Sequence, residues 1–134
     1  MSGPLFVPAP ATEVAIALVR ERLPDGFDDV LVSDRVPDDR PERMVRLSRL
    51  PGGGLAAAGA TDVVRLLVEC WSIDDGEAER LANVVRAVLA SSRSHWAAGT
   101  FIRHWKEDGG PYEFPDTSGQ ARWQLTGELL LKVG

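Results

Sequence analysis

From Thr61 to Trp71 the residues alternate between two sides of an extended chain, and the two sides differ in polarity. One side consists of Val64, Leu66, Val68 and Cys70, and the other of Arg65, Leu67, Glu69 and Trp71. Successive side chains of a strand point to opposite faces of its sheet. The pattern therefore predicts one long strand that packs one face on a core and leaves the other face nearer water.

A helix is predicted directly after this strand. Asp74 suits the N-cap position, and Glu77, three residues on, is placed to return a hydrogen bond to the cap backbone. Apolar residues then recur at spacings of three and four, at Ala78, Leu81, Ala82, Val85, Val88 and Leu89. This period predicts an amphipathic helix that ends near Ala90 and packs on the strand.

Further elements follow from the same kinds of pattern. They are a helix capped by Thr12 and running to about Leu23, and strands at 30–32, 43–50, 100–106 and 120–133. Gly127 interrupts the last strand and indicates a bulge there. Residues 107–119 are rich in Gly, Pro and Asp, which predicts turns. This order predicts an α+β fold in which two helices pack on one face of a mainly antiparallel sheet of about five strands.

Residues 1–10 precede this single domain, which spans residues 11–134. Pro4, Pro8 and Pro10 favour an extended backbone, so the segment is predicted to form an N-terminal arm. Two interpretations stay open. The arm docks on its own domain, or it packs Leu5 and Phe6 on a neighbouring subunit.

The run Gly52-Gly53-Gly54, followed by Leu55, is a second segment without a regular pattern. A phosphate-binding loop would continue with Lys and then Ser or Thr at the start of a helix, and this run does not. We therefore interpret residues 51–59 as the tip of a long hairpin, or as a loop that becomes ordered against a partner.

Composition narrows the class of function. The 134 residues fit one domain, and the net charge of −5 disfavours a general nucleic-acid binder. The single cysteine, Cys70, falls on the apolar side of the predicted strand, so no internal disulfide is expected. The sequence shows neither an export signal nor a run of about 20 apolar residues. We expect a soluble protein made in the cytoplasm.

Patterns that would indicate catalysis or metal binding are weak. His95 and His104 lack metal-ligand spacing to each other or to Cys70. The carboxylate pairs, which fall in a polar loop and at a helix cap, are Asp38-Asp39 and Asp74-Asp75. Neither location indicates the cleft that a catalytic acid–base pair needs. We predict no enzymatic activity and no metal or other cofactor.

Arginine recurs every three residues, at Arg40, Arg43, Arg46 and Arg49. On a strand this spacing places Arg43 and Arg49 on one face and Arg46 on the other, so the run is no continuous basic stripe for nucleic acid. These charges are either solvated at an edge or paired with acids of a neighbouring subunit.

Three longer segments carry a resemblance to a known family. They are RPERMVRLSRLPGGG (residues 40–54), DVVRLLVECWSIDDGEAERLANVVRAVLA (62–90) and GPYEFPDTSGQARWQLTGELLLKV (110–133). In these segments, which make up more than half of the chain, the sequence resembles the tail terminator proteins of long-tailed (siphovirus) bacteriophages, in the form found in phages of actinobacteria. None of the segments is a catalytic signature, and the likeness lies in their overall pattern.

The resemblance implies a structural protein of the virion tail, assembled in the host cytoplasm. It implies a hexameric ring on the last ring of the tail tube, which ends tube polymerisation and joins the tail to the head connector. The implied partners are other copies of the chain, the tail tube protein and a head-completion or connector protein. DNA would pass through the ring without sequence-specific binding, and neither a membrane nor a cofactor is implied.

Two other functions stay open. One is a head-completion or other connector protein of the virion neck. The other, from a different class, is a small α+β ligand-binding regulatory domain.

The predicted contact surfaces combine apolar residues, flexible segments and charges. Trp123 is expected in the core, whereas Trp96 and Trp105 are expected to anchor contacts. The candidate interface residues are Leu5, Phe6, Arg43, Arg46, Arg49, Gly52, Gly53, Gly54, Leu55, Trp96, Trp105, Tyr112 and Phe114.

Overall fold

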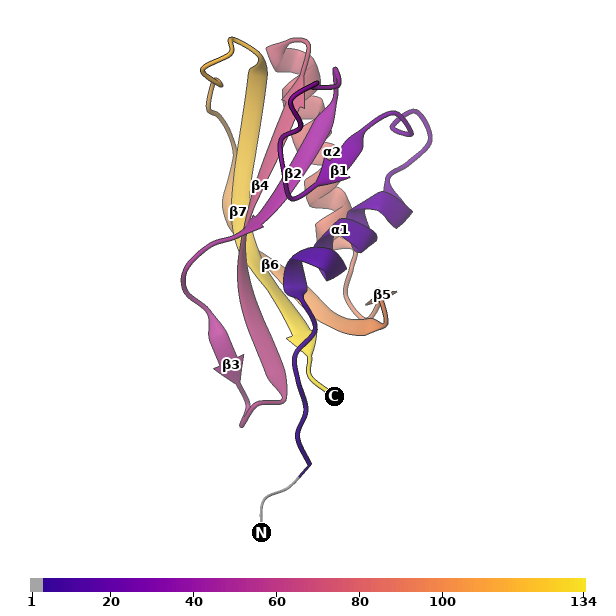
Figure 1. Cartoon of the computed structure of the whole chain (residues 1–134), viewed down its shortest axis with the longest axis vertical. Coiled ribbons are helices and arrows are strands. Elements are labelled where there is room, and N and C mark those ends of the chain that lie inside the picture. Colours follow the sequence, from indigo (N-terminus) through magenta and orange to yellow (C-terminus); the bar gives the residue numbers. More distant parts are fainter. Residues whose placement is uncertain (1–3) are drawn as a thin grey trace.

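The computed structural model describes residues 4–134, which form two helices and seven strands (Figure 1). The helices are α1 (Ala11–Arg22) and α2 (Asp75–Ala90). The strands are β1 (Leu31–Ser33), β2 (Met44–Arg49), β3 (Gly54–Ala56), β4 (Thr61–Ser72), β5 (Trp96–Ala97), β6 (Thr100–Glu113) and β7 (Ala121–Lys132).

The strands form one mixed sheet in the order β1-β2-β4-β7-β6-β5, and β3 pairs with the start of β4. β1 runs parallel to β2, and every other pair in the described chain is antiparallel. The predicted α+β class is confirmed, but the sheet has seven strands where about five were expected. The sequence analysis missed β3 and β5. They have three and two residues, which is too few for an alternation of apolar and polar side chains to be recognised.

Both helices lie on the same side of the sheet (Figure 1). α2 packs on β4, β6 and β7, whereas α1 packs on β1 and β2. The predicted apolar faces of β4 and α2 are fully buried between these layers. Burial in this apolar layer, with the Glu69 carboxylate nearby, raises the pKa of the Cys70 thiol, so Cys70 behaves as a small core residue.

The two helices begin differently. Asp74 caps α2 as predicted, because its carboxylate accepts a hydrogen bond of 2.9 Å from the Glu77 backbone N–H. The prediction that Thr12 caps α1 is wrong, since the cap position is Pro10 and no side chain bonds to that end. Pro10 fixes an extended backbone, and its carbonyl accepts from the Val14 N–H, so the helix starts directly after it.

Strand β6 is longer than predicted. It was expected to end at Lys106, but it runs on to Glu113 through Gly109, Gly110 and Pro111. Its pairing with β7 shifts register at three places, two of which flank Gly109. Bulges of this kind accommodate Gly and Pro in an edge strand, so the turn-type composition misled the prediction.

Gly127 in β7 makes room for a tryptophan ring. A Cβ atom at this position would lie 2.4 Å from the ring of Trp105 and 2.7 Å from the Lys106 carbonyl oxygen. The bulge expected at Gly127 therefore lies in the partner strand β6, and Gly127 itself stays in regular pairing with Leu66 of β4. Trp105, one of the candidate contact residues, is partly buried and packs against the core.

We expect Gly127→Ala to lower the free energy of unfolding by about 1–3 kcal/mol, because the added methyl group would overlap the Trp105 ring. Urea denaturation measures this change. Gly76→Ala in the first turn of α2 is the control, and it should leave stability unchanged or slightly raised, since its Cβ would meet nothing closer than 3.5 Å. A Gly127→Ala protein as stable as the wild type would contradict the packing described.

Candidate protein-interaction site

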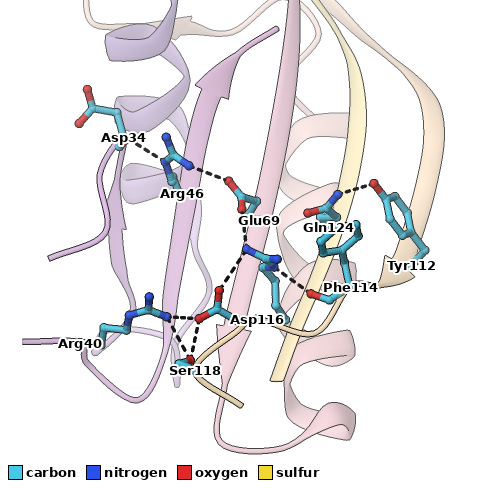
Figure 2. Close-up of polar contacts among 10 residues, drawn as sticks. Asp34, Arg40, Arg46, Glu69, Tyr112, Phe114, Asp116, Ser118 and Gln124 are labelled. Atoms are coloured by element: carbon cyan, nitrogen blue, oxygen red, sulfur yellow. Dashed lines mark hydrogen bonds and ion pairs between the residues drawn. The ribbon is translucent and has the colours of Figure 1, made fainter. Parts of the chain in front are cut away.

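The face of the sheet away from the helices, called here the outer face, carries a connected polar network (Figure 2). Three adjacent strands supply its centre, with Arg46 from β2, Glu69 from β4 and Arg122 from β7. Arg46 lies directly across from Glu69, and Arg122 lies across from Trp71, two residues further along β4. The alternation in β4 correctly predicted a face of mixed polarity, but the expectation that this face lies nearer water is wrong at Glu69 and Trp71, which are buried.

Glu69 is the buried charge at the centre of this network. Glu69 is 4% exposed, and its carboxylate accepts from Arg46 and from Arg122, each at 3.2 Å. Arg46 also donates to the Asp34 carbonyl oxygen at 3.0 Å. A buried carboxylate needs paired cations to offset lost hydration, so these arginines hold the three strands in one register.

Arg122 also fastens the loop that connects β6 to β7. Its Nε donates to the Phe114 carbonyl oxygen at 2.8 Å, and its guanidinium lies 3.4 Å from the Asp116 carboxylate. The same guanidinium lies over two aromatic rings, 5.4 Å from the Trp71 centroid and 4.9 Å from the Phe114 centroid. These cation–π contacts and hydrogen bonds hold residues 114–120 against the outer face.

Asp116 anchors the tip of this loop. It accepts a hydrogen bond of 2.6 Å from the Ser118 hydroxyl and forms ion pairs with Arg40 and Arg122. The Ser118 hydrogen bond, followed by the charge and hydrogen bond of Arg40 and the charge of Arg122, lowers the pKa of Asp116 to about 2. The loop that contains Arg40 is thereby joined to the loop between β6 and β7.

The predicted arginines are all paired within the chain. Arg46 binds Glu69, as described above. Arg43 pairs with Asp29 and lies 4.8 Å over the ring of Phe27, on the helix side of the sheet. Arg49 lies 3.7 Å from Asp62. The faces predicted for these residues are correct, and each finds an acidic partner in its own chain.

One end of the molecule holds the arm from residue 4 onwards and the C-terminal residues (Figure 1). This terminal end comprises residues 4–10, 49–65, 91–103 and 130–134, where Thr61 of β4 pairs with Lys132 of β7. Its exposed large apolar side chains are Leu5, Phe6, Val7, Leu55 and Trp96. A hollow of about 340 Å³ lies beside the arm, between Val7, Trp96 and Gly134.

The opposite end, called here the distal end, comprises residues 24–30, 35–43, 73–77 and 113–122. Here Ser72 of β4 pairs with Ala121 of β7. Ile73 and Phe114 are exposed at this end, and Tyr112 is exposed beside them. The rings of Tyr112 and Phe114 meet edge to face at 6.4 Å, and the Gln124 amide donates to the Tyr112 hydroxyl. The predicted residues Tyr112 and Phe114 thus lie at the rim of the outer face.

The glycine run brings the backbone close to β4, within the hairpin that was predicted for residues 51–59. A Cβ atom at Gly53 would lie 2.2 Å from the Val63 carbonyl oxygen, and the φ angle of Gly53 is +72°. Gly54 and Leu55 then form part of β3, and the hairpin tip falls at residues 57–60. Glycine is required at position 53 because a side chain would strike the neighbouring strand.

Within residues 4–134, no group of three or more His, Cys, Asp or Glu residues is placed to hold a metal ion. Neither α1 nor α2 is long and apolar enough to cross a membrane. The chain matches no protein-family model and none of the curated proteins.

Sequence reasoning missed the network around Glu69. The contacts of this network join residues far apart in the sequence, such as Glu69 and Arg122, which are 53 positions apart. Only the register of β4 on β7 brings them together, and alternation within one strand does not give that register. The sequence offered one indication of the network: Glu69 falls on the same side of its strand as the large apolar residue Trp71.

We expect Arg122→Leu to lower the free energy of unfolding by about 3–5 kcal/mol, because it leaves the Glu69 carboxylate buried with one partner. The double variant Glu69→Leu/Arg122→Leu should be less destabilised than this single variant, since no buried charge remains and Arg46 can be solvated. Urea denaturation of the three proteins measures the difference. A double variant that is destabilised more than Arg122→Leu would contradict the pairing.

The lowered pKa of Asp116 predicts a stability contribution that depends on pH. The contribution is present above the unfolded-state value of 3.8 and is lost as pH falls towards about 2. Asp116→Asn should therefore destabilise the protein at pH 6, and its difference from wild type should shrink between pH values of about 4 and 2. Asp38→Asn, in an exposed loop, is the control. Thermal melts across this range test it, and a constant difference would contradict the assignment.

Proposed function

We propose that this chain is a structural assembly protein that works as a tail terminator of a long-tailed bacteriophage. Copies would form a ring on the head-proximal end of the tail tube, a hexamer as the resemblance to tail terminators implies. The ring would end tube polymerisation and bind a head-completion or connector protein on its other side. DNA would pass through it without sequence-specific contacts.

The observation that carries this proposal is the placement of the exposed apolar side chains. Eight large apolar residues are exposed in the described chain, five at the terminal end and three at or beside the distal end. The ends are joined by strands β4 and β7 of 12 residues each, which span roughly 40 Å. A protein that sits between a tube and a connector needs two such separated contact surfaces.

The exposed apolar residues of the N-terminal arm also support the proposal. Residues 4–7 are exposed, while Ala9 packs against the core and fixes the point where the arm leaves the domain. The Phe6 ring lies close to Gly134, where a Cβ atom would be 3.2 Å away. Leu5 and Val7 keep 89% and 75% of their surface exposed. Apolar residues held at a fixed point and left uncovered are typical of a segment that packs on a partner.

A stop codon early in the gene tests the proposal in the phage genome that encodes the chain. Electron microscopy of the lysate should then show heads without tails and free tails of irregular length, and a plasmid copy of the gene should restore normal particles. Free tails of uniform length would identify a neck connector that acts after tube growth. Normal particles without the protein would overturn the proposal.

We expect Leu5→Ser/Phe6→Ser to reduce the yield of joined particles at least tenfold in the same complementation assay, because the arm loses its apolar contacts. Circular dichroism and thermal melting should be unchanged, since neither side chain belongs to the core. Leu5→Met/Phe6→Leu, which keeps the apolar character, is the matched control and should complement. Full complementation by the serine variant would remove the arm from the contact surface.

A further inference from the structure

The hollow of about 340 Å³ beside the arm, called here the terminal hollow, has an aromatic wall. Trp96 of β5 and Phe101 of β6 are paired across the two strands, and their rings meet edge to face at 5.4 Å. Between these strands Ala98 and Gly99 form a tight turn, with φ angles of +47° and +73°. The strand pairing and the ring contact therefore hold this wall in one position.

The arm forms another wall of the terminal hollow. Ala9 lines the hollow and also packs against the core, which fixes the arm at that point. Val7 lines the hollow too and keeps 75% of its surface exposed, while the Phe6 ring lies against Gly134. A volume at the lower limit of small-molecule sites suits one or two side chains of a partner better than a whole small molecule. The hollow is thus a preformed site for an apolar side chain.

The terminal end is basic, although the whole chain is acidic. Its segments hold four Arg and one Lys against one Asp, a formal side-chain charge of +4, whereas the chain carries −5. The acidic residue, Asp62, is 5% exposed and lies 3.7 Å from Arg49. Lys132 lines the hollow, and Arg93 lies three residues before Trp96. Both cations are exposed and have no acidic partner within residues 4–134, so they are free to pair with another molecule.

An acidic molecule that suits this surface is either a protein segment or a nucleic acid, and the charges favour the protein segment. A nucleic acid needs a row of free cations that follows its phosphates. Here Arg49 already pairs with Asp62 and Arg65 with Asp108, each at 3.7 Å, and the net charge of the chain repels phosphates. A protein segment needs only a few carboxylates, and its apolar side chain fills the hollow.

We propose that the terminal hollow binds a short segment of a different protein of the particle, in which Asp or Glu flanks a large apolar side chain. The apolar side chain enters between Val7 and Trp96, and the carboxylates pair with Lys132 and Arg93. This inference rests on the proposed function, and it adds the chemistry of the partner that the terminal end contacts.

The distal end of a second copy also holds apolar and acidic residues, but its shape suits the hollow less well. The Phe114 ring is held by the guanidinium of Arg122 at 4.9 Å and by the Tyr112 ring at 6.4 Å. Ile73 lies in the two-residue connection between β4 and α2. A hollow that takes one or two side chains requires a segment that can project into it, so a separate protein is the better partner.

The test uses the full chain, with a random library of peptides of about twelve residues as the probe. Selection on the immobilised chain should enrich peptides in which Asp or Glu stands next to Trp, Phe or Leu. Fluorescence anisotropy then measures the affinity of the most enriched peptide. We expect Trp96→Ala and Lys132→Glu each to weaken binding about tenfold, because the first removes the aromatic wall and the second reverses a charge. Raising NaCl from about 0.1 to 1 M should also weaken binding.

Trp96→Phe and Lys132→Arg are the matched controls, because they keep an aromatic ring and a positive charge, and both should bind the peptide as the wild type does. Circular dichroism should show that all four variants are folded, since both side chains are exposed. No enrichment, enrichment of neutral or basic peptides, or equal binding by Trp96→Ala would overturn the proposal. Tighter binding of single-stranded DNA of about twelve nucleotides, or self-association that Trp96→Ala abolishes, would also overturn it and assign the hollow to nucleic acid or to a second copy.

The two proposals fail separately. If the early stop codon disturbs tails but no acidic apolar peptide binds, the chain acts in the tail and its terminal end contacts the partner in another way. If such peptides bind and the hollow variants lose them, but phage particles form normally without the protein, the hollow binds these segments and the tail function is wrong.

Discussion

The buried carboxylate of Glu69 is the constraint on which the outer face depends. A charge that is nearly removed from water must be paired, and the two cations come from the strands on either side. Arg46 thereby ties β2 to β4, and Arg122 ties β7 to β4. Arg122 then uses its remaining donors and its flat surface to hold the loop at Phe114 and Asp116. One buried group thus couples the sheet register to the shape of the distal end.

This coupling explains why the two ends differ from the middle of the molecule. At the centre of the outer face the charges of Arg46, Glu69 and Arg122 are paired within the chain, and the helices cover the other face. Exposed apolar side chains gather where the strands end, beside the arm with Phe6 and beside Ile73. The long strands hold these two surfaces apart at a fixed distance. A rigid spacer with different surfaces at its two ends is suited to a place in an assembly, which is the role we propose.

The long elements with a regular apolar pattern could be predicted from the sequence, whereas the contacts between them could not. Alternation in β4, the helical period of α2 and the Asp74 cap each depend on neighbours along the chain. The extension of β6 past Lys106 depends on bulges, and the pairing of Glu69 with Arg122 depends on the register of two distant strands. The position of Trp105 follows from a space that Gly127 leaves on another strand. Such features arise only from tertiary packing.

The central claim is that both ends of the molecule are covered in the assembled state. Hydroxyl-radical footprinting of the free chain and of the chain in assembled particles tests it most directly, because it reports the solvent access of each side chain. We expect protection of Phe6 and Trp96 at the terminal end and of Ile73 and Phe114 at the distal end, with Val84 on the outer surface of α2 unchanged. Protection centred on α2, with both ends equally accessible in the two states, would contradict the account.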